Sequence, residues 1–206
     1  MSEPTILGKG ANTPVTSPSV LLTLTWQGGS TLDVSGLLLA SNGKVRNDDD
    51  FVFYNQPTHA SGAVTHRGGG PGSDALAVDL ATLPTEIEKV VVAASADTGT
   101  FGDLTHLELV VSDAATGTDL VRFADMGASS ETAFVVGELY RRNGAWKFRA
   151  VGQGWASGLA GLATDYGISV AEAEPESPQP ASPDAVPPPP SAAMPPPPPA
   201  PGTVPH

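Results

Sequence analysis

The chain has 206 residues, with 22 acidic and 10 basic side chains, no cysteine, and a formal net charge of −12. A surface this acidic repels phosphate backbones and anionic lipid headgroups, so we expect neither nucleic acid nor a membrane surface as a partner. Without cysteine the chain has no disulfide, no thiolate nucleophile and no cysteine-bound metal, a composition that fits the reducing cytoplasm.

Apolar and polar residues alternate through the first half of the chain, with the period of two that is typical of half-buried β-strands. The predicted strands are residues 19–26, 32–41 and 51–55. In the first of them, Val20, Leu22 and Leu24 share one face. A single helical turn is predicted over residues 79–83, because Pro84 would end a helix there.

The second half continues the pattern, with strands predicted at residues 90–94, 107–111, 120–123 and 133–140. The clearest hairpin joins residues 132–141 to 145–153, because the Asn143-Gly144 pair between them tolerates the positive φ angles of a tight turn. Only residues 156–166 space their apolar side chains like a helix, and Gly167 is placed to end it. The predicted fold is therefore all-β: a two-sheet antiparallel β-sandwich with a short C-terminal helix.

The C-terminal segment differs sharply in composition from the rest of the chain. Residues 171–206 contain 15 of the 21 prolines and no lysine or arginine. A segment with so few large apolar residues cannot bury enough surface to offset its ordering entropy. We therefore assign residues 1–170 to one domain and predict a disordered, partly polyproline II tail over 171–206. Such a tail can serve as a spacer or dock into an aromatic groove.

An acidic turn, RNDDDFVFYN, covers residues 46–55. Three adjacent carboxylates repel one another unless solvent, a basic side chain or a hard cation offsets their charge. If strand alternation begins here, Asp48 and Asp50 point to one side, while Asn47 and Asp49 point to the other. A calcium site and a solvated turn that caps the strand entry both fit this pattern.

Other kinds of site have weaker support in the sequence. The histidines His59, His66 and His106 lack an accompanying cysteine or HExxH pair, so we expect them to be structural or exposed. No GxSxG elbow or GxxxxGK[ST] loop is present, so we expect no enzyme activity and no small-molecule substrate. No apolar run approaches the roughly 20 residues that span a bilayer, and the N-terminus does not resemble a secretory signal, so a cytoplasmic location is expected.

Three stretches of the sequence form a recognisable set: DDDFVFYN in the acidic turn, VGELYRRNG, which ends in the predicted hairpin turn, and WKFRAVGQGW before the predicted helix. Together they resemble the TerD family of tellurium-resistance and general stress proteins. The resemblance extends over roughly residues 4–170. It implies a β-sandwich, a non-enzymatic role in stress resistance, and calcium bound through acidic loops.

Carried over to this chain, the family's calcium ligands fall on Asp33, Asp48, Asp50, Asp74 and Asp97. Several acidic positions are missing, however. Thr31 stands where the family has a first aspartate, the acidic loop is contracted to residues 66–74, and Ala96 replaces a histidine. Each carboxylate lost weakens the attraction for Ca²⁺, so we expect calcium binding to be reduced. The alternative is a metal-independent adaptor that binds partner proteins through the sandwich face and the proline-rich tail.

Overall fold

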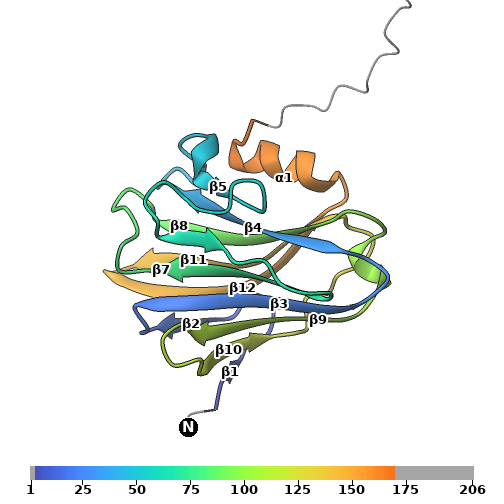
Figure 1. Ribbon diagram of the computed structural model, residues 1–206, viewed down its shortest axis with the longest axis horizontal. Coiled ribbons are helices and arrows are strands. Elements are labelled where there is room, and N and C mark those ends of the chain that lie inside the picture. Colours follow the sequence, from blue (N-terminus) through green and yellow to red (C-terminus); the bar gives the residue numbers. More distant parts are fainter. Residues whose placement is uncertain (1–2, 170–206) are drawn as a thin grey trace, which may run out of the picture. The chain divides into compact units, whose positions relative to one another are not determined.

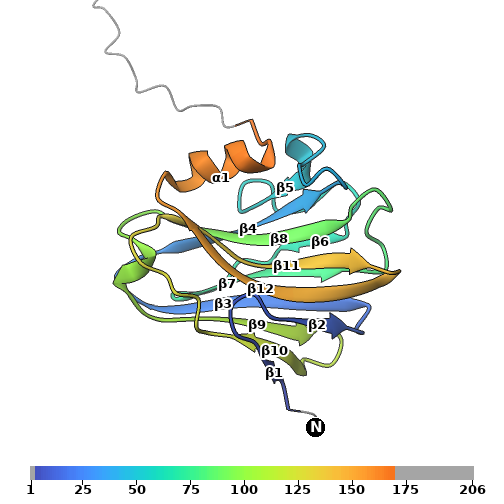
Figure 2. The ribbon, with the colours of Figure 1, turned by 180° about the vertical axis from the view of Figure 1, so that it is seen from behind.

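A computed structural model describes residues 3–169 as two six-stranded sheets packed face to face (Figure 1 and Figure 2). Sheet A has the order β1 (Thr5–Ile6), β10 (Asp119–Phe123), β9 (Leu104–Asp113), β3 (Ser19–Gly28), β7 (Ser73–Asp79), β6 (Val64–His66). Sheet B has the order β2 (Asn12–Val15), β12 (Ala145–Trp155), β11 (Ala133–Arg142), β8 (Lys89–Ala96), β4 (Leu32–Leu39), β5 (Phe51–Val52). All paired neighbours are antiparallel except β1 and β10. The predicted all-β sandwich is confirmed.

Sheet A buries one face, as its alternating sequence predicts. In β3, Val20, Leu22 and Leu24 are fully buried in the core between the sheets, whereas Leu21 and Thr23 on the other face are half-buried. A strand with one solvated face needs apolar residues only at every second position. The local sequence is therefore sufficient to determine which face of sheet A is buried.

Sheet B is buried on both faces at its centre, and this explains its continuous apolar runs. Leu38 faces the core between the sheets, while Leu37 and Leu39 belong to a second cluster on the outer face. The helix α1 (Gly158–Tyr166) covers that outer face and contributes the buried Leu162 to the cluster. Gly167 ends the helix at a φ of 78°, in the left-handed region that glycine adopts without strain. The predicted C-terminal helix is confirmed.

The hairpin between β11 and β12 also matches its prediction. Arg142 pairs with Ala145 across a two-residue turn in which Asn143 and Gly144 have φ angles of 53° and 77°. Both angles fall in the region that an Asn-Gly pair accepts at little cost.

Several features of the secondary structure differ from the sequence prediction. Residues 79–83 do not form a helical turn, so that prediction is wrong. Instead β7, which was not predicted, ends at Asp79, whose carboxylate accepts hydrogen bonds from the Ala81 and Thr82 N–H groups. Strand β2 was also missed, because Pro14 argues against a strand; its position at the edge of sheet B makes a proline acceptable.

No helix among residues 3–169 is long and apolar enough to cross a membrane. The prediction of a disordered tail over 171–206 lies outside the described residues.

Candidate functional site

The acidic turn forms a short 3₁₀ helix, η1 (Asp48–Asp50), and not the beginning of an alternating strand. The Asn47 side chain accepts a hydrogen bond from the Asp49 N–H at 2.9 Å and so caps the turn. The predicted alternation is therefore wrong for these residues: Asp48 and Asp49 are exposed, and Asp50 alone is fully buried. Asp48 and Asp50 do not point to a common side.

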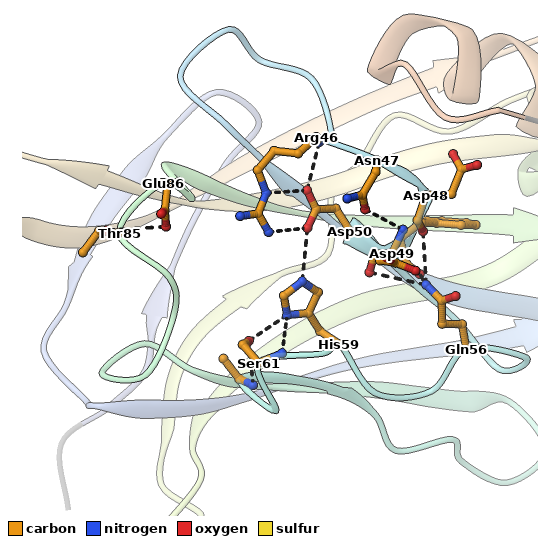
Figure 3. Close-up of polar contacts among 12 residues, drawn as sticks. Arg46, Asn47, Asp48, Asp49, Asp50, Gln56, His59, Ser61, Thr85 and Glu86 are labelled. Carbon is orange, nitrogen blue, oxygen red and sulfur yellow. Dashed lines mark hydrogen bonds and ion pairs between the residues drawn. The ribbon is translucent and has the colours of Figure 1, made fainter.

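Asp50 is neutralised by groups of the chain itself (Figure 3). Arg46 donates to it from Nε at 2.8 Å, from Nη2 at 2.7 Å and from the backbone N–H at 2.9 Å, and His59 Nε2 lies 3.1 Å from Oδ1. Burial alone would raise the pKa of Asp50, but the hydrogen bonds from Arg46 and His59 outweigh it and lower the pKa. With its oxygens occupied in this way, Asp50 is a structural carboxylate.

Asp48 and the turn around it secure neighbouring segments. Asp48 Oδ1 accepts a hydrogen bond from the Ser169 N–H at 3.0 Å, beyond the end of α1. Gln56 Nε2 donates to the carbonyl oxygens of Asp48 and Phe51, at 3.1 and 2.7 Å. The acidic turn therefore joins the chain before β5 to the chain after α1.

Asp74 links the two sheets. It lies in β7 of sheet A, where it is buried, and its carboxylate accepts hydrogen bonds from the Val34 N–H at 2.8 Å and the Ala75 N–H at 2.8 Å. His66 Nε2 lies 2.9 Å from its Oδ2. Val34 belongs to β4 of sheet B, and β5 pairs with β4 only at Gly36 and Leu37. The Asp74 carboxylate thus supplies the acceptor that a longer β5 would otherwise provide.

Asp33 and Asp97 lie together on the outer face of sheet B. Asp33 pairs with Ser95 in the β4–β8 ladder, and the Asp97 N–H donates to the Thr31 carbonyl at 3.1 Å. Burial, followed by the charge of Asp97 and a hydrogen bond with it, raises the pKa of Asp33; the charge of Asp74 adds to this, and His66 opposes it. Unlike Asp50, Asp33 has no arginine or lysine that lowers its pKa. The negative charge here is only partly offset.

A cavity of about 410 Å³ opens beside Asp33, between the start of β4 and the glycine-rich loop of residues 68–72. Its wall includes Trp26, His66 and Asp74, and no lysine or arginine. A Cβ on Gly69 would fall 1.9 Å from the Ser73 carbonyl oxygen, so the loop folds closely on itself and requires glycine there. The loop brings backbone groups to this cavity and no carboxylate apart from Asp74 at its end.

The five predicted aspartates therefore do not form one site. Asp33, Asp74 and Asp97 are close enough for their charges to interact, whereas Asp50 is held by Arg46 and His59. Within residues 3–169, no group of three or more histidine and acidic side chains is arranged to hold a metal ion. Sequence reasoning missed that His59 and His66 each bind one of these carboxylates, because neither spacing matches a known pattern.

Replacing Asp33 by asparagine is expected to raise the free energy of unfolding at neutral pH, without added metal, by roughly 0.2–1 kcal/mol, the size of a close like-charge interaction in a sheet. The sign follows from the raised pKa: the folded state disfavours the ionised carboxyl, so the neutral amide relieves a cost. The gain should vanish as pH falls below the ordinary value of 3.8, where the wild-type carboxyl is neutral as well. Urea unfolding at pH 7 and pH 3.5 measures it, and a loss of stability at pH 7 would contradict it.

The sequence of this chain matches a known protein family. The profile of the TerD domain matches residues 4–166. The chain is 42% identical over 186 residues to the tellurium resistance protein TerD of Serratia marcescens, covering 79% of this chain and 97% of that protein. It is 39% identical over 152 residues to general stress protein 16U of Bacillus subtilis (strain 168), covering 68% of this chain and 78% of that protein.

A similar fold occurs in the crystal structure of a homologue of telluride resistance protein (TerD) from Streptomyces coelicolor A3(2). The TM-score is 0.59 and the sequence identity 22%, over 71% of this chain and 95% of that one. At this identity the likeness supports the fold alone.

Proposed function

We propose a function from the premise that this chain belongs to the TerD domain family. In this proposal the chain acts in tellurium or chemical stress resistance without catalysis. It does so by binding a single hard cation at Asp33 and Asp97. The family assignment rests on the TerD profile over residues 4–166 and on relatives that include a chemical-damaging agent resistance protein of Clostridium acetobutylicum. The observation that carries the cation site is the paired, incompletely compensated charge of Asp33 and Asp97.

The donor set does not fit a calcium site built from all five aspartates. Asp50 is fully engaged by Arg46 and His59, and Asp74 already accepts hydrogen bonds from two backbone N–H groups. Asp48 accepts a hydrogen bond from the Ser169 N–H. Two carboxylates remain that no hydrogen-bond donor among the described residues occupies, Asp33 and Asp97. Carboxylate oxygen is the ligand type that Ca²⁺ prefers, so these two fit the ion chemically, with water providing the remaining coordination.

Two carboxylates make a weak site. Calcium affinity increases with the number of charged ligands and with the rigidity of the site, and weak modules bind Ca²⁺ with dissociation constants of roughly 10⁻⁴ to 10⁻³ M. Asp97 is exposed and Asp33 only half-buried, so the ion would remain in contact with solvent. In this role the two carboxylates would hold the cation and so join the start of β4, which carries Asp33, to the end of β8, which Asp97 follows.

Calorimetric titration with millimolar Ca²⁺ tests this proposal. The wild-type chain should give a binding heat and a higher melting temperature, and Asp33→Asn plus Asp97→Asn should lose both. Asp48→Asn plus Asp49→Asn is the matched control, because it removes two carboxylates from the exposed acidic turn and should keep the response. No heat in the wild type, or an equal heat in both double variants, would refute the site.

A second candidate function, a metal-independent adaptor, is favoured by a different observation. Among residues 3–169 only three large apolar side chains are exposed, and two of them, Tyr54 at 57% and Leu159 at 38%, border one small cavity. Exposed apolar side chains that gather around a cavity are typical of a contact site for another molecule.

A further inference from the structure

We propose that the cavity between β4, the segment after β5 and the start of α1 binds an arginine side chain of a partner protein. This inference rests on the adaptor role, the second of the proposed functions, and gives it a defined ligand chemistry. It does not require calcium, so its test can be carried out with a chelator present.

The cavity has an aromatic wall. Its volume is about 170 Å³, and Phe51, Phe53 and Tyr54 line it together with Leu159 of α1. The Phe51 and Phe53 rings stack with centroids 4.8 Å apart, and Tyr54 meets Phe53 edge-on at 5.5 Å. Figure 1 and Figure 2 both show β5 and α1 above the β4 end of sheet B, and residues of both segments line the cavity. The wall presents flat, partly exposed rings, a surface on which a planar cation can stack.

The opposite side of the cavity is polar and acidic. Asp33, Ser35, Ser95 and Asp97 line it, and no lysine, arginine or histidine does. Alternation along β4 places Asp33 and Ser35 on the outer face of sheet B, the face that also carries Leu37. The cavity therefore combines two carboxylates with aromatic rings and lacks a cation of its own.

Ser35 adds a hydroxyl to the polar side of the cavity. Only 7% of this residue is exposed, and it lines the same cavity as the two carboxylates. A hydroxyl oxygen accepts hydrogen bonds, so a cationic donor that enters the cavity can bind it together with the carboxylates.

Arginine fits these features better than other occupants. Its guanidinium is planar, stacks on aromatic rings and offers five N–H donors, enough to serve two carboxylates and a hydroxyl at once. A lysine ammonium has three donors and no flat face. The chain's own residues 171–206 have no lysine or arginine and carry four acidic residues, so the aspartates would repel that segment.

Titration of the full chain with N-acetyl-arginine methylamide in EDTA, followed by NMR, tests the inference. The resonances of Tyr54, Leu159 and Ser35 should shift together, with a dissociation constant that is at least roughly fivefold lower than for the uncharged, isosteric citrulline amide. Tyr54→Ala and Asp97→Asn should each weaken arginine binding by roughly fivefold or more. Both positions are exposed, so these variants should fold. Asp49→Asn, an exposed aspartate outside the cavity, should bind like the wild type.

Several results would overturn the inference. Equal binding of the arginine and citrulline amides would show that the positive charge does not contribute to binding. Equal binding of the lysine and arginine amides would show that stacking of a planar guanidinium on the rings does not contribute. Unchanged affinity in Tyr54→Ala and Asp97→Asn would place the ligand elsewhere. A peptide with the sequence of residues 187–199 that shifts the same resonances more strongly would make the proline-rich segment the occupant. Loss of the calcium response alone leaves the arginine site intact, since calcium is absent from this assay.

Discussion

Replacing Asp50 by alanine is expected to lower the free energy of unfolding by about 2–3 kcal/mol, the size of hydrogen bonds to a charged group, because Asp50 is buried whereas the Arg46 side chain is 35% exposed and can be hydrated in the variant. The substitution leaves the Arg46 guanidinium without its carboxylate and deprives the buried His59 ring of the group 3.1 Å from its Nε2. Urea unfolding at pH 7 measures the loss. The matched control is Asp49→Ala, which removes the exposed neighbouring carboxylate and should change stability by less than about 0.5 kcal/mol.

The Asp50 contribution should also depend on pH in a defined direction. Its pKa is lowered in the folded protein, so its stabilisation is present above the ordinary value of 3.8 and is lost as pH falls below that value toward the folded pKa. The stability difference between wild type and Asp50→Ala should therefore be constant near neutral pH and shrink below about pH 4. A difference that grows on acidification, or equal losses in Asp50→Ala and Asp49→Ala, would show that this carboxylate is not a structural anchor.

Replacing Asp74 by alanine is expected to cost about 3 kcal/mol, because it leaves two buried backbone N–H groups and the His66 ring without their acceptor. The loss should be the same with EDTA as with calcium, since the partners of this carboxylate are hydrogen-bond donors of the chain. Chemical unfolding of Asp74→Ala, with the exposed Asp125→Ala as control, measures it. A loss that occurs only with calcium would make Asp74 a metal ligand.

A double-mutant cycle separates the two roles of Asp74. If the His66 contact is a substantial part of its contribution, Asp74→Ala and His66→Ala together should cost less than the sum of the single changes, by roughly 0.5–3 kcal/mol. Strict additivity would instead assign the whole effect to the two backbone N–H groups of Val34 and Ala75.

These two carboxylates form the frame within which the candidate site lies. Asp50 fixes the turn that leads into Phe51, and Asp74 holds the open edge of β4 one residue from Asp33. Both His59 and His66 come from one small hairpin, in which Thr58 pairs with Thr65. The hairpin therefore supports both ends of the surface that carries Asp33, Asp97 and the aromatic cavity. Asp33→Asn should raise the stability of the folded chain while weakening cation binding at this site, a trade-off that is common at binding sites.

The strands, the hairpin turn and the terminal helix were predictable because their signals are local. Alternation in β3 specifies a buried face without knowledge of the partner strand, and Asn143-Gly144 specifies a tight turn by its own backbone preferences. The prediction failed where local signals mislead. Three consecutive aspartates beside an alternating strand suggested extended backbone, yet the Asn47 cap produces a 3₁₀ turn that buries Asp50 alone. The short, small side chains of β7 gave no clear period.

The sequence by itself determined that this chain forms an all-β sandwich, that it belongs with the TerD proteins, and that its aspartates are the side chains to examine. Only the tertiary structure decided which aspartates remain available. Each carboxylate depends on partners that lie far away along the chain: Asp74 on the Val34 N–H in the other sheet, and Asp33 on Asp97 across the β4–β8 ladder. Charge compensation is a property of distances in space, and residue spacing does not specify those distances until the sheets are packed.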